Sequence, residues 1–377
     1  GQVIGRAKDL RQMQELLASI PDDVLEFNTG QNNLSKWLYS RGLFPLAASI
    51  RRLDASHFRS TAEHREALTG LIRDYRNLLG QGVIARFDPE TYSDSIAFAR
   101  MGEGSIGGKA RGLAFMNSML IKYRFYDRHP EVRITIPRSV VIATDYFDAF
   151  IRDNGLEYII AQEFSDEEIL AEFVGARLPE PLYDQLRAYI RTVRAPLAVR
   201  SSSKLEDSHY QPFAGIYSTY MIPHTDNEDQ MLRLLVKAIK CVYASVYYAA
   251  SRAYIQSSQN LISEEKMAVI IQEVCGTEQD GLYFPTCSGV ARSINYYPIG
   301  DERPEEGICQ IAMGLGKLIV EGGRVLRFSP VYPRRALQTS TPRLALSETQ
   351  TEVLALDLRP EAFRTSPDDE VNIRRLG

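Results

Sequence analysis

The sequence has little of what marks secreted, zinc-binding or membrane-spanning proteins. Its 377 residues include four cysteines, and the longest apolar runs fall short of the roughly 18 residues that cross a bilayer. No signal peptide is recognised at the start. The cysteines have apolar neighbours and no C-x-x-C spacing, so we expect reduced core thiols rather than disulfides or a zinc site. They are Cys241, Cys275, Cys287 and Cys309. Together these absences predict a cytoplasmic protein without a membrane partner.

The sequence has no excess of positive charge. The net charge is −4, with 44% hydrophobic and 24% charged residues, which is ordinary for a globular protein. Nucleic acids and anionic membranes both require a basic surface, so neither is expected as the main partner. A chain of this length suffices for two or three domains.

Residues 1–92 predict a small helical module of unknown role. Apolar side chains recur at helical spacing over 9–18, 33–40, 43–52 and 61–79. No catalytic constellation occurs in this part, and we expect the isolated His57 and His64 to be surface residues. Glycine and proline between residues 80 and 92 predict a boundary.

A glycine-rich stretch at 101–112 precedes a helical pattern at 110–126. A glycine-rich turn at a helix N-terminus is typical of a phosphate site, and Lys109 is placed to reach that phosphate. The glycines at 102, 104 and 107 also fit the dinucleotide fingerprint, but residues 95–100 make a poor strand before them. The P-loop pattern fails, because Glu103 and Ala110 occupy its glycine and hydroxyl positions. Kinase motifs are absent as well.

A second candidate anion site follows a predicted strand at 197–199. Arg200 and the serines at 201–203 leave this strand, and Gly215 precedes another strand candidate at 216–222. Guanidinium, hydroxyl and backbone N–H groups all bind phosphate oxygens. A serine-rich surface loop with a structural arginine is an equally open interpretation of this stretch.

The remaining pattern predicts a mixed α+β fold. Helices are expected at 145–154, 165–173, 180–193 and, as one long buried helix, 227–256. Strands are expected at 133–144, 266–275, 288–297 and 308–313, and a hairpin at 320–328 around Gly322-Gly323. The predicted divisions are a first lobe at 93–196, a second lobe at 197–340, and a linker or truncated element at 341–377.

The ordered motifs resemble the nucleotide-binding domain of the phosphoenolpyruvate synthase and pyruvate, phosphate dikinase family. Each motif alone has little specificity, but the set occurs in the family's order over roughly residues 96–330. The resemblance implies an ATP-grasp-like domain whose two lobes close over ATP. The matching segments are GGKARGLAFM at 107–116, IPRSVVIAT at 136–144, LAVRSSSKLED at 197–207, FAGIYSTY at 213–220, MAVIIQEV at 267–274, SGV at 288–290 and GLG at 314–316.

The resemblance also implies roles for individual residues. Lys109 corresponds to the lysine of the family's G-G-K motif, and Arg200 to the arginine of V-R-S-S, so both are expected to hold phosphate. Val274 is expected to meet adenine through its backbone. The expected catalytic residues are Lys109 and Arg200, and the expected nucleotide-binding residues are Gly107, Gly108, Lys109, Arg200, Ser201, Gly215, Thr219, Gln272, Glu273 and Val274.

The sequence departs from the family at several points. Lys317 follows the G-L-G motif where the family usually has glutamate. The family's later acidic metal-binding segment, its phosphoryl-carrying histidine motif G-G-x-T-x-H and its pyruvate-binding barrel are not recognised. His209 is the one histidine near the expected phosphates, and a surface position is expected for it. The chain therefore resembles a fragment or a degenerate relative, and its metal ligands stay unknown.

The resemblance implies an ATP-dependent phosphotransferase using ATP and Mg²⁺. Phosphate would pass from ATP to a histidine on a domain absent from this chain, and then to pyruvate or a similar acceptor. The chain alone is expected to bind nucleotide with little turnover, and a homodimer is one expected assembly. Two alternatives stay open: a non-catalytic nucleotide-sensing or interaction relative of the same fold, and a dinucleotide oxidoreductase.

Overall fold

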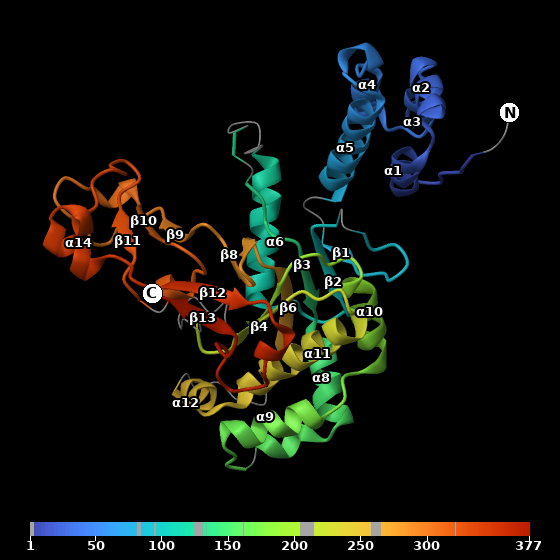
Figure 1. The fold of residues 1–377 in the computed structure, drawn as a ribbon. Helices are drawn as coiled ribbons and strands as arrows, with labels where there is room; N and C mark the ends of the chain where they lie inside the picture. The colour runs from blue at the N-terminus through green and yellow to red at the C-terminus, as the bar shows by residue number, and fades with distance from the viewer. Residues whose placement is uncertain are drawn as a thin grey trace. The chain divides into compact units, whose positions relative to one another are not determined.

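The structure is a computed structural model of the chain, and its architecture mixes helices with several β-sheets (Figure 1). It describes residues 4–80, 84–93, 96–123, 131–132, 134–160, 162–203, 215–257, 265–320 and 322–377. Within those ranges no helix is both long and apolar enough to cross a membrane. The chain divides into two compact units: Gly1–Ala85, Ser93–Phe98 and Ala114–Ile136 form one, and Arg86–Tyr92, Ala99–Leu113 and Pro137–Gly377 form the other.

In the first unit, the helices of residues 10–80 share one apolar core. The four helices predicted before residue 80 are confirmed, each to within two residues, and α2 is an additional helix. Leu17, Leu25, Leu38 and Leu68 fill the core and are at most 4% exposed. The helices are α1 (Leu10–Ser19), α2 (Asp22–Gly30), α3 (Asn33–Ser40), α4 (Phe44–Arg51) and α5 (Thr61–Gly80).

The two histidines of this unit have different environments. His57 is exposed, as predicted. The prediction for His64 is wrong: this side chain is 1% exposed and stacks on the Phe58 ring at 4.9 Å, and its Nε2 has no hydrogen-bond partner among the described residues. Burial disfavours the charged imidazolium and lowers the pKa of His64 from 6.5, although a hydrogen bond with the Leu53 backbone works in the opposite direction.

This burial predicts that acid destabilises the helical unit. The folded-state pKa of His64 lies below its unfolded value, so its contribution is complete above about pH 6.5 and is lost as the pH falls through the folded-state pKa. We expect His64→Gln to flatten the decline of melting temperature between about pH 7.5 and 5.5. The exposed His57→Gln is the matched control and should leave the decline unchanged. Equal slopes for His64→Gln and the parent chain would contradict the prediction.

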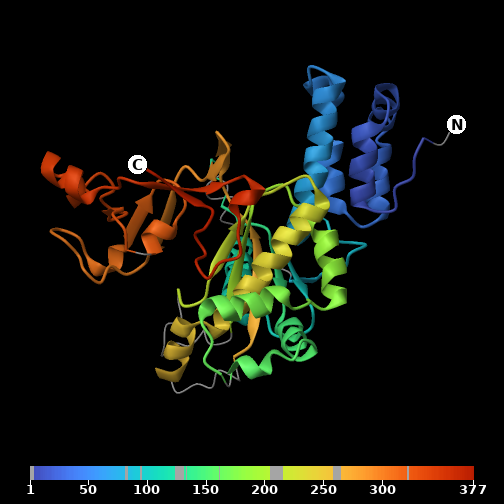
Figure 2. The ribbon, with the colours of Figure 1, turned by 60° about the horizontal axis from the view of Figure 1, so that its bottom comes forward.

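A six-stranded sheet forms the main element of the second unit. Its order is β1-β2-β3-β6-β4-β5, and β6 is antiparallel to both β3 and β4. Helix α11 packs on β4 and β5, and Figure 2 shows it in yellow lying across the strands. The strands are β1 (Ala85–Arg86), β2 (Phe98–Met101), β3 (Ser139–Ile142), β4 (Leu197–Ser203), β5 (Thr219–Ile222) and β6 (Met267–Glu273).

The presence of β2 corrects the expectation of a poor strand before the glycine-rich loop. Strand β2 ends at Met101, and helix α6 (Gly107–Lys122) begins after the loop. The dinucleotide fingerprint also requires parallel strands in a βαβ unit. The antiparallel pairing of β6 with both neighbours differs from that arrangement, so the strand–loop–helix order alone does not favour a dinucleotide site.

The predicted long helix at 227–256 is interrupted. Tyr248 has extended backbone angles, φ −64° and ψ 156°, and the Asp166 carboxylate accepts a hydrogen bond from the next N–H, that of Ala249, at 2.8 Å. These local contacts start a new helix, a feature that apolar periodicity does not reveal. The predicted helices before it are confirmed. The helices are α8 (Thr144–Asp153), α9 (Asp166–Gly175), α10 (Glu180–Ile190), α11 (Glu228–Ala244) and α12 (Ala249–Ser257).

Two smaller sheets complete the second unit. One has the order β11-β10-β9 and the other β13-β12-β8-β7. A two-residue hairpin at Gly322-Gly323 is not formed, because α13 (Lys317–Val320) lies in the connection between β10 and β11. The strands are β7 (Thr277–Gln279), β8 (Leu282–Phe284), β9 (Ser288–Arg292), β10 (Ile308–Ala312), β11 (Leu326–Phe328), β12 (Val353–Asp357) and β13 (Ile373–Leu376).

Residues after 340 contribute to the core of this unit. The sequence suggested a linker or a truncated element, whereas the segment contains α14 (Pro342–Glu348), β12 and β13. Leu354, Ala355 and Leu356 are fully buried in β12. A linker would not bury such a strand. Pairing with β8 and β13 and packing against Leu315 make this short segment a buried strand.

The cysteines are unpaired, as expected, but they are not all in the core. Cys241 is buried in α11, and burial raises the pKa of its thiol to about 12. Cys275 and Cys287 are exposed, which corrects the expectation of core thiols. Apolar neighbours in the sequence do not determine burial at positions near the ends of short strands.

Candidate functional site

The glycine-rich loop between β2 and α6 is held by the start of α8. The Asp145 carboxylate accepts hydrogen bonds from the N–H groups of Glu103 at 2.9 Å and Gly104 at 3.0 Å. The Thr144 hydroxyl accepts another from the N–H of Ser105 at 3.0 Å. These three N–H groups therefore fix the loop and are not directed at a ligand.

The first turn of α6 lies directly against β4. Gly107 has φ +70°, and a Cβ atom there would lie 1.7 Å from the carbonyl oxygen of Ser202. The Ser202 hydroxyl donates to the carbonyl of Ile106 at 2.8 Å and accepts from the N–H of Ala110 at 3.1 Å. This contact requires glycine and joins two segments that are more than 90 residues apart in sequence.

Lys109 extends from this turn to β4. Its ammonium donates to the Ser201 hydroxyl at 3.0 Å, and the lysine is half-buried while Ser201 is fully buried. Strand β5 begins at Thr219 opposite Arg200, so the edge of β4 beyond Arg200 adjoins α6 rather than β5. The two candidate phosphate motifs of the sequence thus meet at the end of β4.

Arg200 belongs to a row of polar residues that crosses the sheet. It pairs with Thr219 on β5, and its Nη1 donates to the Gln272 amide oxygen on β6 at 3.3 Å. The Gln272 amide nitrogen donates to the hydroxyl of Ser139 on β3 at 3.0 Å. Consecutive side chains on a strand leave it on opposite faces. The structure therefore brings Lys109 to Ser201 and Arg200 to Gln272, but it does not bring Lys109 and Arg200 into contact.

Glu273 makes a structural ion pair. Its carboxylate accepts a hydrogen bond from Arg138 Nε at 3.0 Å, and the two side chains are 23% and 12% exposed. Arg138 also donates to the carbonyl of Thr192 at 2.6 Å. Burial lowers the pKa of Arg138, but the Glu273 charge more than offsets this, and the net pKa is raised. This pairing orients Glu273 toward the protein.

The backbone of Val274 already has partners. Its N–H donates to the carbonyl of Pro196 at 2.9 Å, and its carbonyl accepts from the Tyr283 hydroxyl at 3.1 Å. A carbonyl has a second lone pair, so the Val274 oxygen retains capacity for one more hydrogen bond. Only this acceptor is available for the adenine contact that the sequence predicts.

The other predicted residues occupy different environments. Gly108 is buried in the first turn of α6. Gly215 is exposed with φ +81°, and a Cβ atom there would meet nothing within 4 Å. His209 and the adjoining residues at 204–214 lie outside the described residues.

The sequence analysis missed an acidic pair next to Thr219. Asp369 accepts a hydrogen bond from the N–H of Thr219 at 2.8 Å, and Lys317 contacts Asp369 at 2.7 Å and Glu370 at 2.9 Å. Burial lowers the pKa of Lys317, but the hydrogen bonds with both carboxylates outweigh this and raise it. The run D-D-E at 368–370 was a visible signal, but nothing in it indicated proximity to Thr219.

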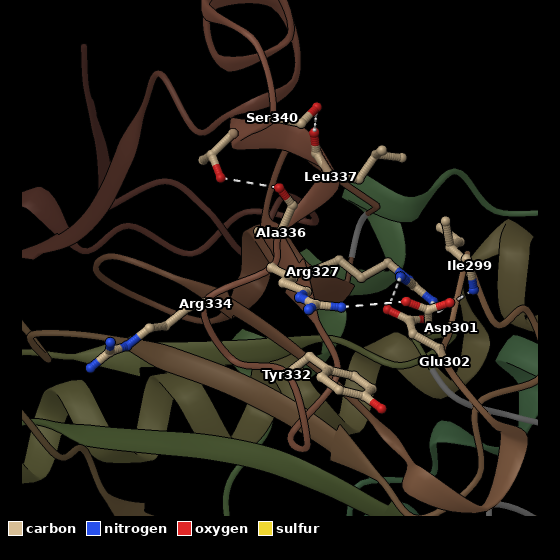
Figure 3. Close-up of a pocket in the computed structure, with 12 residues that line it drawn as sticks. Ile299, Asp301, Glu302, Arg327, Tyr332, Arg334, Ala336, Leu337 and Ser340 are labelled. Atoms are coloured by element: carbon tan, nitrogen blue, oxygen red, sulfur yellow. Dashed lines mark hydrogen bonds and ion pairs between the residues drawn. The ribbon is translucent and has the colours of Figure 1, made fainter.

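A cavity of about 400 Å³ lies in the part of the second unit that contains β11 (Figure 3). Arg327 forms an ion pair with Glu302 at 3.1 Å, and these side chains are 21% and 11% exposed. Figure 3 shows Arg334 pointing away from this pair. None of the predicted site residues lines this cavity. The residues that line it are Ile299, Gly300, Asp301, Glu302, Arg327, Tyr332, Arg334, Arg335, Ala336, Leu337, Thr339 and Ser340.

Comparison with known proteins finds a family that matches most of this chain. The family described as pyruvate phosphate dikinase, AMP/ATP-binding domain, matches residues 103–355. Phosphoenolpyruvate synthase of Aeropyrum pernix is 25% identical over 293 residues, which cover 71% of this chain and 30% of that protein. The uncharacterized phosphotransferase YvkC of Bacillus subtilis is 28% identical over 193 residues, which cover 50% of this chain and 20% of that protein. The chain thus spans less than a third of the curated relatives it matches.

Proposed function

The chain belongs to the pyruvate phosphate dikinase AMP/ATP-binding domain family, and on that premise we propose that it is the ATP-binding part of a phosphoenolpyruvate synthase-like phosphotransferase. Phosphate would pass from ATP to a histidine on a domain outside this chain, and then to pyruvate or a similar acceptor. The observation that carries the proposal is the junction of α6 with β4, where Lys109 contacts Ser201 at 3.0 Å.

The chemistry of this junction suits a phosphate. It combines one ammonium with hydroxyl groups at the start of a 16-residue helix, whose N-terminal N–H groups favour anions. Arg200, the next residue along β4, carries a guanidinium that binds phosphate oxygens bidentately. The proposal requires both side chains to rearrange, Arg200 most of all, because Arg200 leaves β4 on the face opposite to Ser201 and donates to Gln272, whereas Lys109 donates to Ser201.

Phosphoryl transfer needs positioning and neutralisation of charge more than covalent chemistry by the protein. We assign charge neutralisation to Lys109 and Arg200. Gln272 and Thr219 orient Arg200 from β6 and β5. Gly107 allows the helix to approach β4 closely enough for Lys109 to reach the phosphates. The apolar strand β6 and the Val274 carbonyl would accommodate the base between two lobes of an ATP-grasp-like fold.

The described residues form no Mg²⁺ site from protein ligands alone. They contain no group of three or more His, Cys, Asp or Glu side chains that could hold a metal ion. The acidic pair nearest to Thr219, Asp369 and Glu370, is already paired with Lys317, and Glu370 also pairs with Arg375. The proposal therefore assigns no step to Mg²⁺ held by these residues.

The test is nucleotide-dependent stabilisation. ATP at about 100 times its Kd should stabilise the chain by roughly 2.7 kcal/mol, visible as a raised melting temperature. We expect Lys109→Ala and Arg200→Ala each to weaken ATP binding by roughly 10- to 100-fold, because each removes charge-assisted hydrogen bonds worth about 1.5–3 kcal/mol. AMP, which lacks the outer phosphates, should be less sensitive to these changes.

Exposed residues on α11 supply matched controls for this test. Lys237→Ala and Arg233→Ala remove the same charges from exposed positions, and ATP binding should be unchanged. Stabilisation by NAD but not ATP would instead favour the oxidoreductase alternative. ATP stabilisation that survives both Lys109→Ala and Arg200→Ala would refute the assigned phosphate site.

Lys317 favours a second candidate, a nucleotide-sensing relative without catalysis. It occupies the position after G-L-G and forms ion pairs with two carboxylates near Thr219. Under this alternative the longer protein binds ATP but forms no phosphohistidine from labelled ATP. A G-G-x-T-x-H segment in the longer protein, with labelled histidine, would support the phosphotransferase instead.

A further inference from the structure

A cavity beside strands β12 and β13 is lined by three arginines. Its volume is about 400 Å³, and its lining residues are Arg359, Glu361, Ala362, Arg364, Val371 and Arg374. We propose that this cavity binds a phosphate group, either free or as a small organic phosphate ester. The site is separate from the α6–β4 junction, since the two share no residue.

A buried carboxylate fixes two of the three arginines. Asp357 at the end of β12 has a side chain only 4% exposed. It accepts from Arg359 through Nε at 3.0 Å and Nη2 at 2.7 Å, and from Arg374 Nε at 2.9 Å. These hydrogen bonds, that of Arg359 foremost, lower the pKa of Asp357, so the carboxylate stays ionised. The guanidinium groups are thereby oriented before any ligand arrives.

The arginines retain donors for a ligand. Arg359 Nη1 and both Nη atoms of Arg374 make no hydrogen bond to the part of the chain that the structure describes. Arg364 is exposed, and it forms no hydrogen bond or ion pair with any described residue. A guanidinium presents parallel N–H groups that match the oxygens of phosphate.

The charge and shape of the cavity select the class of ligand. Three guanidinium groups outnumber the two carboxylates, Asp357 and Glu361, so the cavity favours an anion. Ala362 and Val371 add apolar wall, which suits the organic part of an ester. A volume of about 400 Å³ lies within the range of small-molecule sites, roughly 300–1,000 Å³.

Contacts on both sides of the cavity hold its lining in place. Phe363 packs edge-to-face on Tyr220, with ring centroids 6.3 Å apart, and the Tyr220 hydroxyl donates to the carbonyl of Ser366 at 2.7 Å. The Asn372 amide donates to the carbonyl of Met221 at 2.8 Å. The segment that carries Arg364 is therefore anchored on β5, which reduces the ordering cost of binding.

The test is phosphate binding at constant ionic strength, measured by calorimetry and thermal shift with chloride as the reference anion. We expect saturable binding of inorganic phosphate that Arg364→Ala weakens about 10-fold or more. Arg364 is exposed and makes no hydrogen bond or ion pair to the described residues, so its removal should not impair folding, which circular dichroism checks. Arg343→Ala is the matched control, because it removes an exposed arginine from α14, and it should bind phosphate normally.

Two further arms identify the ligand and the site. Tighter binding of glycerol 3-phosphate than of inorganic phosphate assigns an organic ester, and equal or weaker binding assigns the free anion. Lys109→Ala should retain phosphate binding whether or not the α6–β4 junction binds ATP. Loss of phosphate binding in Lys109→Ala, equal affinity in Arg364→Ala and the parent chain, or no saturable binding would each overturn the proposal.

Discussion

Replacing Gly107 by alanine is expected to destabilise the second unit by about 3 kcal/mol or more, because the substitution combines overpacking with an unfavourable left-handed backbone. The added Cβ would lie 1.7 Å from the carbonyl oxygen and 2.4 Å from the carbonyl carbon of Ser202. Ser202 cannot retreat, since it pairs with Ala268 in the sheet. Urea or thermal unfolding measures the effect, at roughly 2–4 °C of melting temperature per kcal/mol.

Gly112→Ala is the matched control in the same helix. Nothing lies within 4 Å of a Cβ atom at this position, and its φ is ordinary. Alanine is the better helix former, so this change should stabilise the chain by about 0.5–1 kcal/mol. A Gly107→Ala variant as stable as the parent would contradict the packing of α6 on β4, and with it the position of Lys109.

Replacing Glu273 by alanine is expected to lower the free energy of unfolding by about 2–3 kcal/mol. The change leaves the guanidinium of Arg138 mostly buried without its ion-pair partner, and removing one partner of a fully buried pair costs about 3–5 kcal/mol. The side chains are 23% and 12% exposed, so solvent screens part of that cost. Denaturant unfolding with a linear extrapolation gives the difference directly.

The comparison with Glu278→Ala isolates the ion pair. Glu278 is an exposed residue of β7, and its removal changes the net charge equally. We expect a change within about 0.5 kcal/mol for this control. If Glu273→Ala proved as stable as the control and yet lost ATP binding, Glu273 would be a nucleotide contact, as the family motif implied, rather than a structural residue.

Local chemistry made several residues recognisable without a structure. Lys109 was visible because glycines precede it at a helix start, and Ser201 because hydroxyls follow Arg200 at a strand end. The partner of Glu273 was not visible. Arg138 lies 135 residues away, and only the register of β3 with β6 brings the two together. His64 was assigned to the surface because an isolated histidine has no periodicity that reveals its burial.

The sequence by itself determined the helical first part, the family of the second part and the side chains proposed to hold phosphate. These follow from short-range patterns: apolar spacing within one helix, and glycine, lysine, arginine and hydroxyl groups within one motif. Tertiary structure alone decided which of them meet. It placed Lys109 on Ser201, set Asp369 against Thr219 and paired Asp357 with two of the three arginines that line one cavity. Such contacts depend on strand register and chain crossing, which no local pattern encodes.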